Sequence, residues 1–272
     1  MGNRRYLIVA RVGDKSLHRH WISGEHRNFD LFLSYYGQTE GKYQEDAEIY
    51  NEIRGPKWPI IHQCIEKNLT EIEKYEVIWF PDDDILAETD TINQMFDLFS
   101  GLRLKLGQPA LTRDSYIAHK VVMKEPNSIA RYTNFVEIMV PLFSIDTLKQ
   151  LMKTFPESES GWGLDFLWPR LLKNADIAVL DITPVIHTRP IAGGGDLYRN
   201  NPNLNMHKDM AKLEELYSDI GLQFGGHRIL RSIPILNIPT EFLHRVSGWL
   251  SRKKNAFHYK RTSRYVPPSG EA

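Results

Sequence analysis

Short apolar runs alternate with longer amphipathic stretches along the first hundred residues. The runs are too short and too rich in β-branched and aromatic residues for helices, and they are Tyr6–Ala10, Phe29–Tyr35, Ala47–Ile53 and Val77–Phe80. The intervening pattern predicts one helix from Pro56 to about Asn68 and another over Thr91–Lys105, with Asp90 as its N-cap. Strands that alternate with helices predict a mostly parallel, doubly wound sheet.

The middle of the chain loses this alternation. Ala130–Val136 and Glu137–Ser144 are rich in apolar and aromatic residues, and they predict mixed or edge strands, with Pro141 as an interruption. The remaining predicted elements are helices over Asp146–Thr154, Asp165–Asn174 and Met206–Ile220 and a strand over Ile177–Leu180. We therefore predict an α/β fold with a mostly parallel, Rossmann-like central sheet, helices on both sides and a small mixed subsheet.

Composition narrows the class of protein only slightly. The chain has 272 residues, of which 42% are hydrophobic and 25% are charged, as in an ordinary soluble domain. Its formal net charge is zero, so nothing indicates a nucleic-acid partner. Cys64 is the only cysteine, which excludes a disulfide framework and a cysteine-based zinc site. No apolar run is long enough for a bilayer span or a signal peptide, and we expect a cytoplasmic protein.

The last part of the chain has a different character. Residues 226–272 contain many lysines and arginines among apolar and aromatic side chains, and almost no acids. We interpret this part as a basic amphipathic extension of a domain that covers residues 1–225. Such a segment predicts a peripheral contact with an anionic membrane surface. The alternative is a solvated tail that packs against the domain.

An acidic triplet, Asp82–Asp84, follows directly after the apolar run Val77–Phe80 and Pro81. Adjacent carboxylates repel one another unless a cation neutralises them. This triplet stands at the carboxyl end of a predicted core strand, where open α/β sheets bind their ligands. Carboxylate oxygens suit Mg²⁺ and Mn²⁺, which commonly bind substrate phosphates as well. The triplet therefore predicts a metal–diphosphate site, and the alternative is a solvated acidic turn.

Two later features carry further chemistry. In Gly161-Trp162-Gly163-Leu164-Asp165, a glycine-flanked turn places an acid at a predicted helix start. Asp165 is either an N-cap or a general base. His187 follows an apolar pair, and a lone histidine is more often structural than a ligand. Two aspartates and a histidine are nevertheless a suitable ligand set for Mn²⁺.

The order and spacing of these features resemble glycosyltransferases of the GT-A fold. The strand that ends in Asp82–Asp84 is similar to their Asp-x-Asp motif, and Gly161–Asp165 resembles the Trp-Gly-x-Asp segment of fringe-like and galactosyltransferase-like enzymes. His187 resembles the late histidine that completes their metal shell. More closely, the chain resembles the family catalogued as domain of unknown function 707, which shows counterparts of Val136–Ser144. The likeness covers roughly Tyr6–Pro190, and the family's acidic motif is looser than the one here.

The resemblance implies roles at the reaction centre. Asp82, Asp84 and His187 would hold Mn²⁺ or Mg²⁺, with Asp82 facing the ribose as the other option. Asp165 would be the catalytic base that deprotonates an acceptor hydroxyl, which favours inversion. Trp162 would be an acceptor platform, although a core position suits a tryptophan equally well.

The resemblance also implies contacts with the donor. Val12 and Gly13 would line the nucleobase pocket, and Lys57 and Arg189 would contact the diphosphate. A surface lysine is the alternative for Lys57. Asp83 is assigned to the nucleotide sugar as well, and the glycine run 193–195 would close over the diphosphate together with Arg189.

These assignments predict a metal-dependent glycosyltransferase. It would move a sugar from a nucleotide-sugar donor to a hydroxyl of a saccharide or lipid-linked saccharide, in the synthesis of a bacterial surface polysaccharide. A nucleotidyltransferase and an aspartate-based phosphatase are alternatives, although Leu86 stands where the phosphatase motif has threonine or valine. A carbohydrate-binding or membrane-surface module without catalysis is the non-enzymatic alternative.

Overall fold

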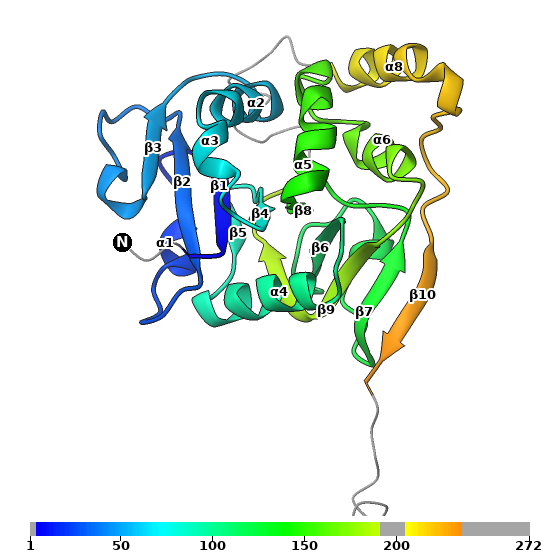
Figure 1. Ribbon diagram of the computed structural model, residues 1–272, viewed down its shortest axis with the longest axis horizontal. Helices are drawn as coiled ribbons and strands as arrows, with labels where there is room; N and C mark the ends of the chain where they lie inside the picture. Colours follow the sequence, from blue (N-terminus) through cyan, green and yellow to red (C-terminus); the bar gives the residue numbers. More distant parts are fainter. Residues whose placement is uncertain (1–3, 191–204, 236–272) are drawn as a thin grey trace, which may run out of the picture. The chain divides into compact units, whose positions relative to one another are not determined.

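A sheet forms the centre of the part of the chain that the computed structural model describes, residues 4–190 and 205–235 (Figure 1). Its strands are β1 (Tyr6–Val12), β2 (Phe29–Tyr35), β3 (Ile49–Glu52), β4 (Val77–Trp79), β5 (Ile85–Leu86), β6 (Leu106–Leu111), β7 (Ser128–Thr133), β8 (Leu142–Ser144), β9 (Ile177–His187) and β10 (Ile229–Pro234). The helices are α1 (His18–Trp21), α2 (Lys57–Lys67), α3 (Leu69–Ile72), α4 (Thr89–Gly101), α5 (Ile145–Leu151), α6 (Leu164–Leu171) and α8 (Met206–Leu216). The glycine run 193–195 lies outside the described residues.

The strand order is β10-β7-β9-β6-β8-β4-β1-β2-β3, and β5 pairs with β9 off this path. The ladders of β1 with β2 and β4, of β2 with β3 and of β6 with β9 are parallel. β8 runs antiparallel between β4 and β6, and β7 runs antiparallel to β9 and β10. This topology confirms the predicted α/β class, with a parallel part around β1 and a mixed part around β8 and β7.

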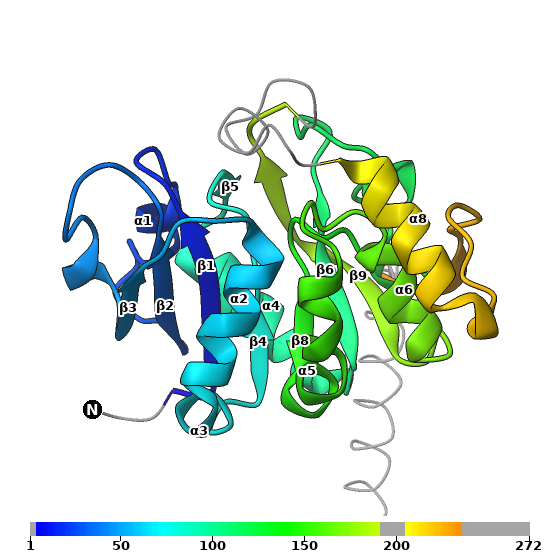
Figure 2. The ribbon, with the colours of Figure 1, turned by 90° about the horizontal axis from the view of Figure 1, so that it is seen from above.

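Helices cover both faces of the sheet, with α4 on one side and α2, α5 and α6 on the other (Figures 1 and 2). The residues of β1 enter the two cores in alternation. Ile8 and Ala10 pack in the core that contains Phe96 of α4, and Leu7 packs in the core that contains Ile61 of α2. Burial of both faces explains why the first five residues of β1, Tyr6–Ala10, form a continuous apolar run without polar alternation.

The sequence did not predict β5, β6 or β10, and of these three strands only β6 lies inside the main strand order. The helix expected to reach Lys105 ends at Gly101, and Arg103 takes a left-handed turn with φ 53° before the strand begins. Pro109 argues against a central strand because it has no N–H for the ladder. The β6–β9 ladder is irregular between Pro109 and Leu111, and β8 pairs with β6 only at its start. The sheet therefore tolerates the proline.

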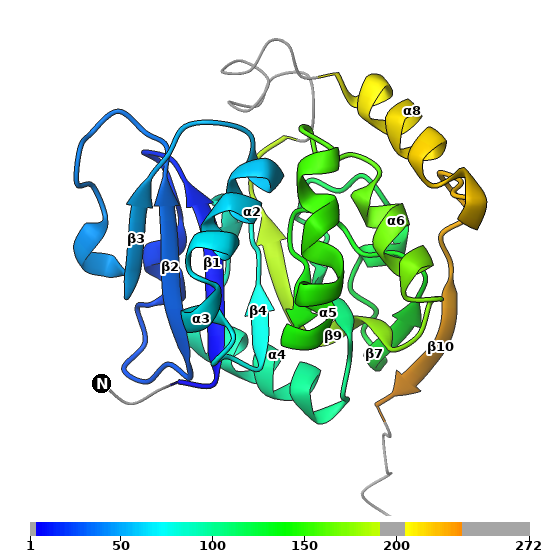
Figure 3. The same cartoon turned by 45° about the horizontal axis from the view of Figure 1, so that its top comes forward.

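Two further differences concern sheet positions. β8 lies inside the sheet and runs antiparallel to both β6 and β4, so the predicted mixed strand is confirmed and the alternative of an edge strand is wrong. β9 is one strand over Ile177–His187, although the sequence predicted a strand only as far as Leu180. Its continuation carries His187 to the same edge of the sheet as the carboxyl end of β4 (Figure 3).

The first compact unit extends to Pro234, beyond the expected boundary at residue 225, because β10 pairs with β7. The second unit begins at Ile235, and the residues from 236 onward lie outside the described part. The proposed membrane role of the basic extension therefore stays a prediction. Within the described ranges, no helix has both the length and the apolar character that a bilayer span requires.

Candidate functional site

The acidic triplet and His187 meet because a short strand joins them. β5 begins immediately after Asp84 and pairs antiparallel with β9, so that Ile85 lies opposite His187. The backbone N–H and the hydroxyl of Thr188 both donate to the carbonyl oxygen of Asp84, at 3.1 and 2.8 Å. Residues about a hundred positions apart are thereby held together at the carboxyl ends of β4 and β9, where α/β sheets bind ligands.

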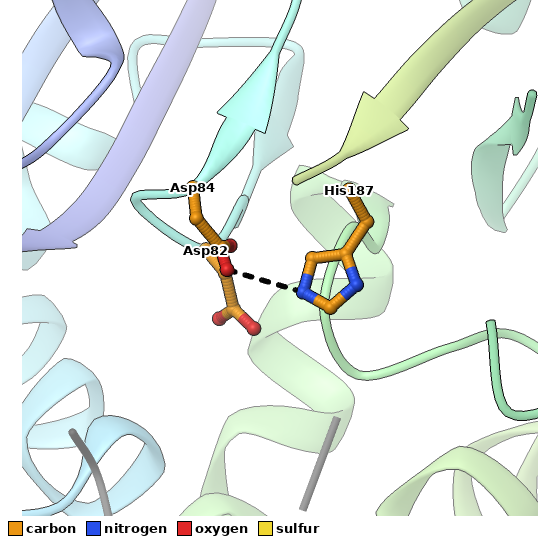
Figure 4. A group of neighbouring side chains, drawn as sticks. All are labelled: Asp82, Asp84 and His187. Atoms are coloured by element: carbon orange, nitrogen blue, oxygen red, sulfur yellow. Dashed lines mark ion pairs between the residues drawn. The ribbon is translucent and has the colours of Figure 1, made fainter. Parts of the chain in front are cut away.

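His187 points its Nε2 atom at the acids. This atom lies 3.3 Å from Oδ2 of Asp84 (Figure 4), and Nδ1 lies 2.8 Å from the carbonyl oxygen of Tyr116. A carbonyl oxygen only accepts, so Nδ1 donates to it and Nε2 is left to face Asp84, as in metal-binding histidines. Burial by itself lowers the pKa of His187, but the hydrogen bond and negative charge of Asp84 outweigh it and raise that pKa.

The three side chains fit a divalent cation. One ligand atom from each of Asp82, Asp84 and His187 lies within 4.8 Å of the other two. Oδ1 of Asp84 is buried and has no hydrogen-bond partner among the described residues. A buried carboxylate oxygen is costly to leave unpaired, and a cation would satisfy it. Two carboxylates and one imidazole suit Mn²⁺, and carboxylates also suit Mg²⁺.

Lys57 contacts the acidic triplet directly. Its ammonium donates to Oδ1 of Asp82 at 2.5 Å and to the carbonyl oxygens of Phe80 and Ile138 at 3.1 and 2.9 Å. These contacts engage all three donors of the ammonium group. Lys57 therefore offsets the charge of Asp82 in this structure, and its contact with a diphosphate stays a prediction.

Asp83 turns to other partners. Its carboxylate accepts from the backbone N–H of Gly13 at 2.8 Å, from the hydroxyl of Tyr36 at 3.2 Å and from Arg189 at 3.0 Å. Gly13 is required by close packing, because a Cβ there would lie 2.8 Å from the Tyr36 hydroxyl. Val12 is fully buried in the core. The loop after β1, Asp83 and Arg189 thus form one connected group beside the cation ligands, and their roles in nucleotide binding stay predictions.

The backbone conformation of the turn before α6 explains its two glycines. Gly161 and Gly163 have φ values of 84° and 92°, the left-handed region that favours glycine. A Cβ on Gly161 would also lie 2.6 Å from the ring of Trp58. Trp162 is half-buried between the two glycines. Its role as an acceptor platform stays a prediction.

Asp165 is one of three side chains that form a second group. It is 4% exposed, and burial raises its pKa to about 7, against the opposing hydrogen bond from the N–H of Phe166. Glu137 is 3% exposed, and burial, followed by the charge of Asp165, raises its pKa to about 8. Met139, two residues after Glu137, accepts a hydrogen bond on its carbonyl oxygen from the N–H of Asp82 at 2.7 Å. The second group therefore lies beside the cation ligands.

No role was predicted for Glu137 or His119, although a ligand atom of each lies within 4.8 Å of the other and of one from Asp165. A signal for Glu137 was present, because it is the only charged residue in the apolar run from Phe135 to Phe143. A lone acid in such a run has to be buried or to interrupt the core. His119 lies in a loop with no motif around it, so no comparable signal existed.

Comparisons with known proteins agree on the fold. The chain resembles a structure of GalNAc-T7 with UDP, GalNAc and Mn²⁺ at a TM-score of 0.52 and 9% identity, covering 80% of this chain and 55% of that one. It resembles S. aureus TarS 1–349 at a TM-score of 0.50 and 13% identity, and the same protein in complex with UDP at a TM-score of 0.50 and 12% identity. Each of these likenesses covers 79% of this chain and 72% of the TarS chain. It spans 44% of a longer TarS structure. The fold is thus that of GT-A glycosyltransferases.

Sequence comparisons add no assignment. No protein-family model matches the chain, and no curated protein matches it. The resemblance to domain of unknown function 707 therefore stays a prediction.

Proposed function

We propose that this chain is a metal-dependent glycosyltransferase that moves a sugar from a nucleotide-sugar donor to a hydroxyl of a saccharide or lipid-linked saccharide. One observation carries the proposal: Asp82, Asp84 and His187 converge at the carboxyl ends of β4 and β9 on a GT-A fold. The complexes of the structural neighbours with UDP and with UDP, GalNAc and Mn²⁺ support a uridine nucleotide as the first donor to test.

The residues of the first group would hold the cation and the diphosphate. Asp82, Asp84 and His187 would bind Mn²⁺ or Mg²⁺ through two carboxylates and Nε2. When bound, the cation supplies Lewis-acid stabilisation of the negative charge on a departing nucleoside diphosphate. Arg189, which is tied to Asp83, would add a second positive charge near that group. The loop at Val12 and Gly13 would lie against the nucleobase.

Asp165 would accept the proton of the acceptor hydroxyl during attack. Its raised pKa suits this role, because a carboxylate with a pKa of about 7 is a stronger base than one near 4 and is still half ionised at neutral pH. A base on the acceptor side implies direct displacement at the anomeric carbon and hence inversion. Trp162, which lies between Gly161 and Gly163 and is half-buried, would pack against the acceptor sugar.

A screen of nucleotide sugars tests the proposal. The full chain with Mn²⁺ is mixed with UDP-sugars and other nucleotide sugars, and thermal unfolding and release of free nucleotide are measured. We expect at least one donor to raise Tm and to be turned over, because a ligand that binds only the native state stabilises it. Asp84→Asn should lose both responses, and Asp219→Asn, at an exposed position, should keep them. Failure of every donor to bind the wild type would overturn the proposal.

A further inference from the structure

A second group of potential cation ligands lies next to the first. His119 precedes the 3₁₀ turn Lys120–Val122, Glu137 lies between β7 and β8, and Asp165 is in the first turn of α6. One ligand atom from each lies within 4.8 Å of the other two, and the group shares no residue with the Asp82, Asp84 and His187 group. Three segments that are distant in the sequence thus place a nitrogen and two carboxylates together.

Glu137 has an oxygen that nothing described in the structure satisfies. Glu137 is only 3% exposed. Its Oε1 atom has less than 1 Å² of accessible surface and no hydrogen-bond partner among the described residues. The backbone around it is fixed. The N–H of Glu137 donates to Oε1 of Gln108 at 2.6 Å, and the N–H of Val140 donates to the carbonyl oxygen of Glu137 at 3.3 Å. These two hydrogen bonds hold the backbone of Glu137 in place.

No lysine or arginine of the described residues neutralises the acids of this group. Asp82 and Asp83 form ion pairs with Lys57 and Arg189. Within residues 4–190 and 205–235, by contrast, no lysine or arginine forms an ion pair with Glu137 or Asp165. Two buried carboxyl groups without a basic partner are unfavourable unless a proton or a cation joins them.

The occupant has to be small. An oxygen with so little accessible surface has no room for a sugar ring, whereas a metal ion bonds at about 2.0–2.2 Å to nitrogen and carboxylate ligands. His119 brings a ring that packs 4.5 Å from Phe135 between centroids, which fixes its plane. One imidazole and two carboxylates form a three-ligand set with a fourth position open, as at many Zn²⁺ sites.

We propose that His119, Glu137 and Asp165 form a second divalent-cation site, for which Zn²⁺ serves as the probe ion, and that an ion bound there withholds Asp165 from the acceptor. The inhibitory part rests on the proposed function, in which Asp165 is the base. The binding part stands without it. Cations would then act in opposite directions at the two sites, activating through Asp82, Asp84 and His187 and inhibiting through the second group.

Counting bound ions tests the binding part without any catalysis. The full chain is stripped with EDTA and dialysed against low-micromolar free Zn²⁺, and bound zinc per chain is measured by atomic spectroscopy. We expect Glu137→Gln and Asp84→Asn each to bind one ion fewer than the wild type, and the double variant two fewer. Glu159→Gln, at an exposed position, should bind the wild-type number. Near-ultraviolet circular dichroism checks that each variant is folded.

A second variant keeps the test independent of the buried carboxyl. His119→Asn, at a half-buried position outside the proposed catalytic groups, should also lose one ion and should remove inhibition by added Zn²⁺ of the Mn²⁺-loaded enzyme. Folded Glu137→Gln and His119→Asn proteins that keep the wild-type zinc count would overturn the second site. Absence of sugar transfer with the expected zinc counts would instead overturn only the proposed function and leave the second site standing.

Discussion

Replacing Lys57 by methionine should destabilise the metal-free protein and make it respond more strongly to Mn²⁺. The ammonium pairs with Asp82 and also donates to two carbonyl oxygens, and its side chain is 14% exposed. Breaking a buried ion pair costs about 3–5 kcal/mol. Because the Asp82 side chain is 33% exposed, water screens its charge, and the ion pair contributes about 1–2 kcal/mol to stability. The hydrogen bonds to the two carbonyl oxygens add about 0.5–1 kcal/mol each.

The expected loss in EDTA is therefore about 2–4 kcal/mol of unfolding free energy. A cation at Asp82, Asp84 and His187 would take over the role of the ammonium and would no longer be repelled by it. If Mn²⁺ then binds about tenfold more tightly to Lys57→Met than to the wild type, saturating Mn²⁺ recovers about 1.4 kcal/mol of the loss.

Urea unfolding with EDTA and with saturating Mn²⁺ measures both quantities. Lys74→Met is the matched control, because Lys74 forms an exposed ion pair with Glu71, and such pairs contribute about 0–1 kcal/mol. A stability loss in Lys57→Met no larger than that in Lys74→Met would refute the importance of the buried ion pair. Equal stabilisation of Lys57→Met and the wild type by Mn²⁺ would refute the competition between the ammonium and the cation.

Three further predictions follow from other parts of the structure. Asp165→Asn should lower turnover about a hundredfold or more while donor binding persists. Wild-type turnover should decrease as the pH is lowered through about 7, because Asp165 becomes protonated there. Equal turnover of Asp165→Asn and the wild type in steady-state assays would exclude Asp165 as the base. Gly13→Ala should weaken nucleotide binding about tenfold in calorimetry, because the added Cβ meets the Tyr36 ring; an equal Kd would contradict this. Arg131→Met should lower the free energy of unfolding by about 3–5 kcal/mol, because buried Asp181 loses its ion-pair partner. The folded variant should bind Mn²⁺ with wild-type affinity, and an altered affinity would contradict a purely structural role for Arg131.

The sequence was sufficient to predict the parallel half of the sheet. β1, β2 and β4 are buried on both faces, so they appear as mainly apolar runs of strand length, interrupted in β2 by Asp30 and Ser34. It was insufficient for β6, because Gly107 and Pro109 are typical of loops. The strand forms because its ladder with β9 tolerates an irregularity at the proline, and this depends on a partner distant in the sequence.

The same distinction applies to the site. Asp82 and Asp84 were identifiable because acids directly after an apolar strand stand at the ligand-binding edge of a sheet. Their meeting with His187 depends on the two-residue strand β5, which is too short to give a pattern. The pairing of Lys57 with Asp82 was equally invisible, because it joins the start of α2 to the end of β4 across the sheet edge. Side-chain partners of this kind are set by tertiary packing and not by local pattern.

The central claim is that the cation held by Asp82, Asp84 and His187 binds the donor's diphosphate. Calorimetric titration of UDP into the full chain, with Mn²⁺ and then with EDTA, tests it most directly. We predict that UDP binds at least about tenfold more weakly in EDTA, and that Asp84→Asn binds UDP in Mn²⁺ as weakly as the wild type does in EDTA. Equal UDP affinity under both conditions, in the wild type and in Asp84→Asn, would contradict the account.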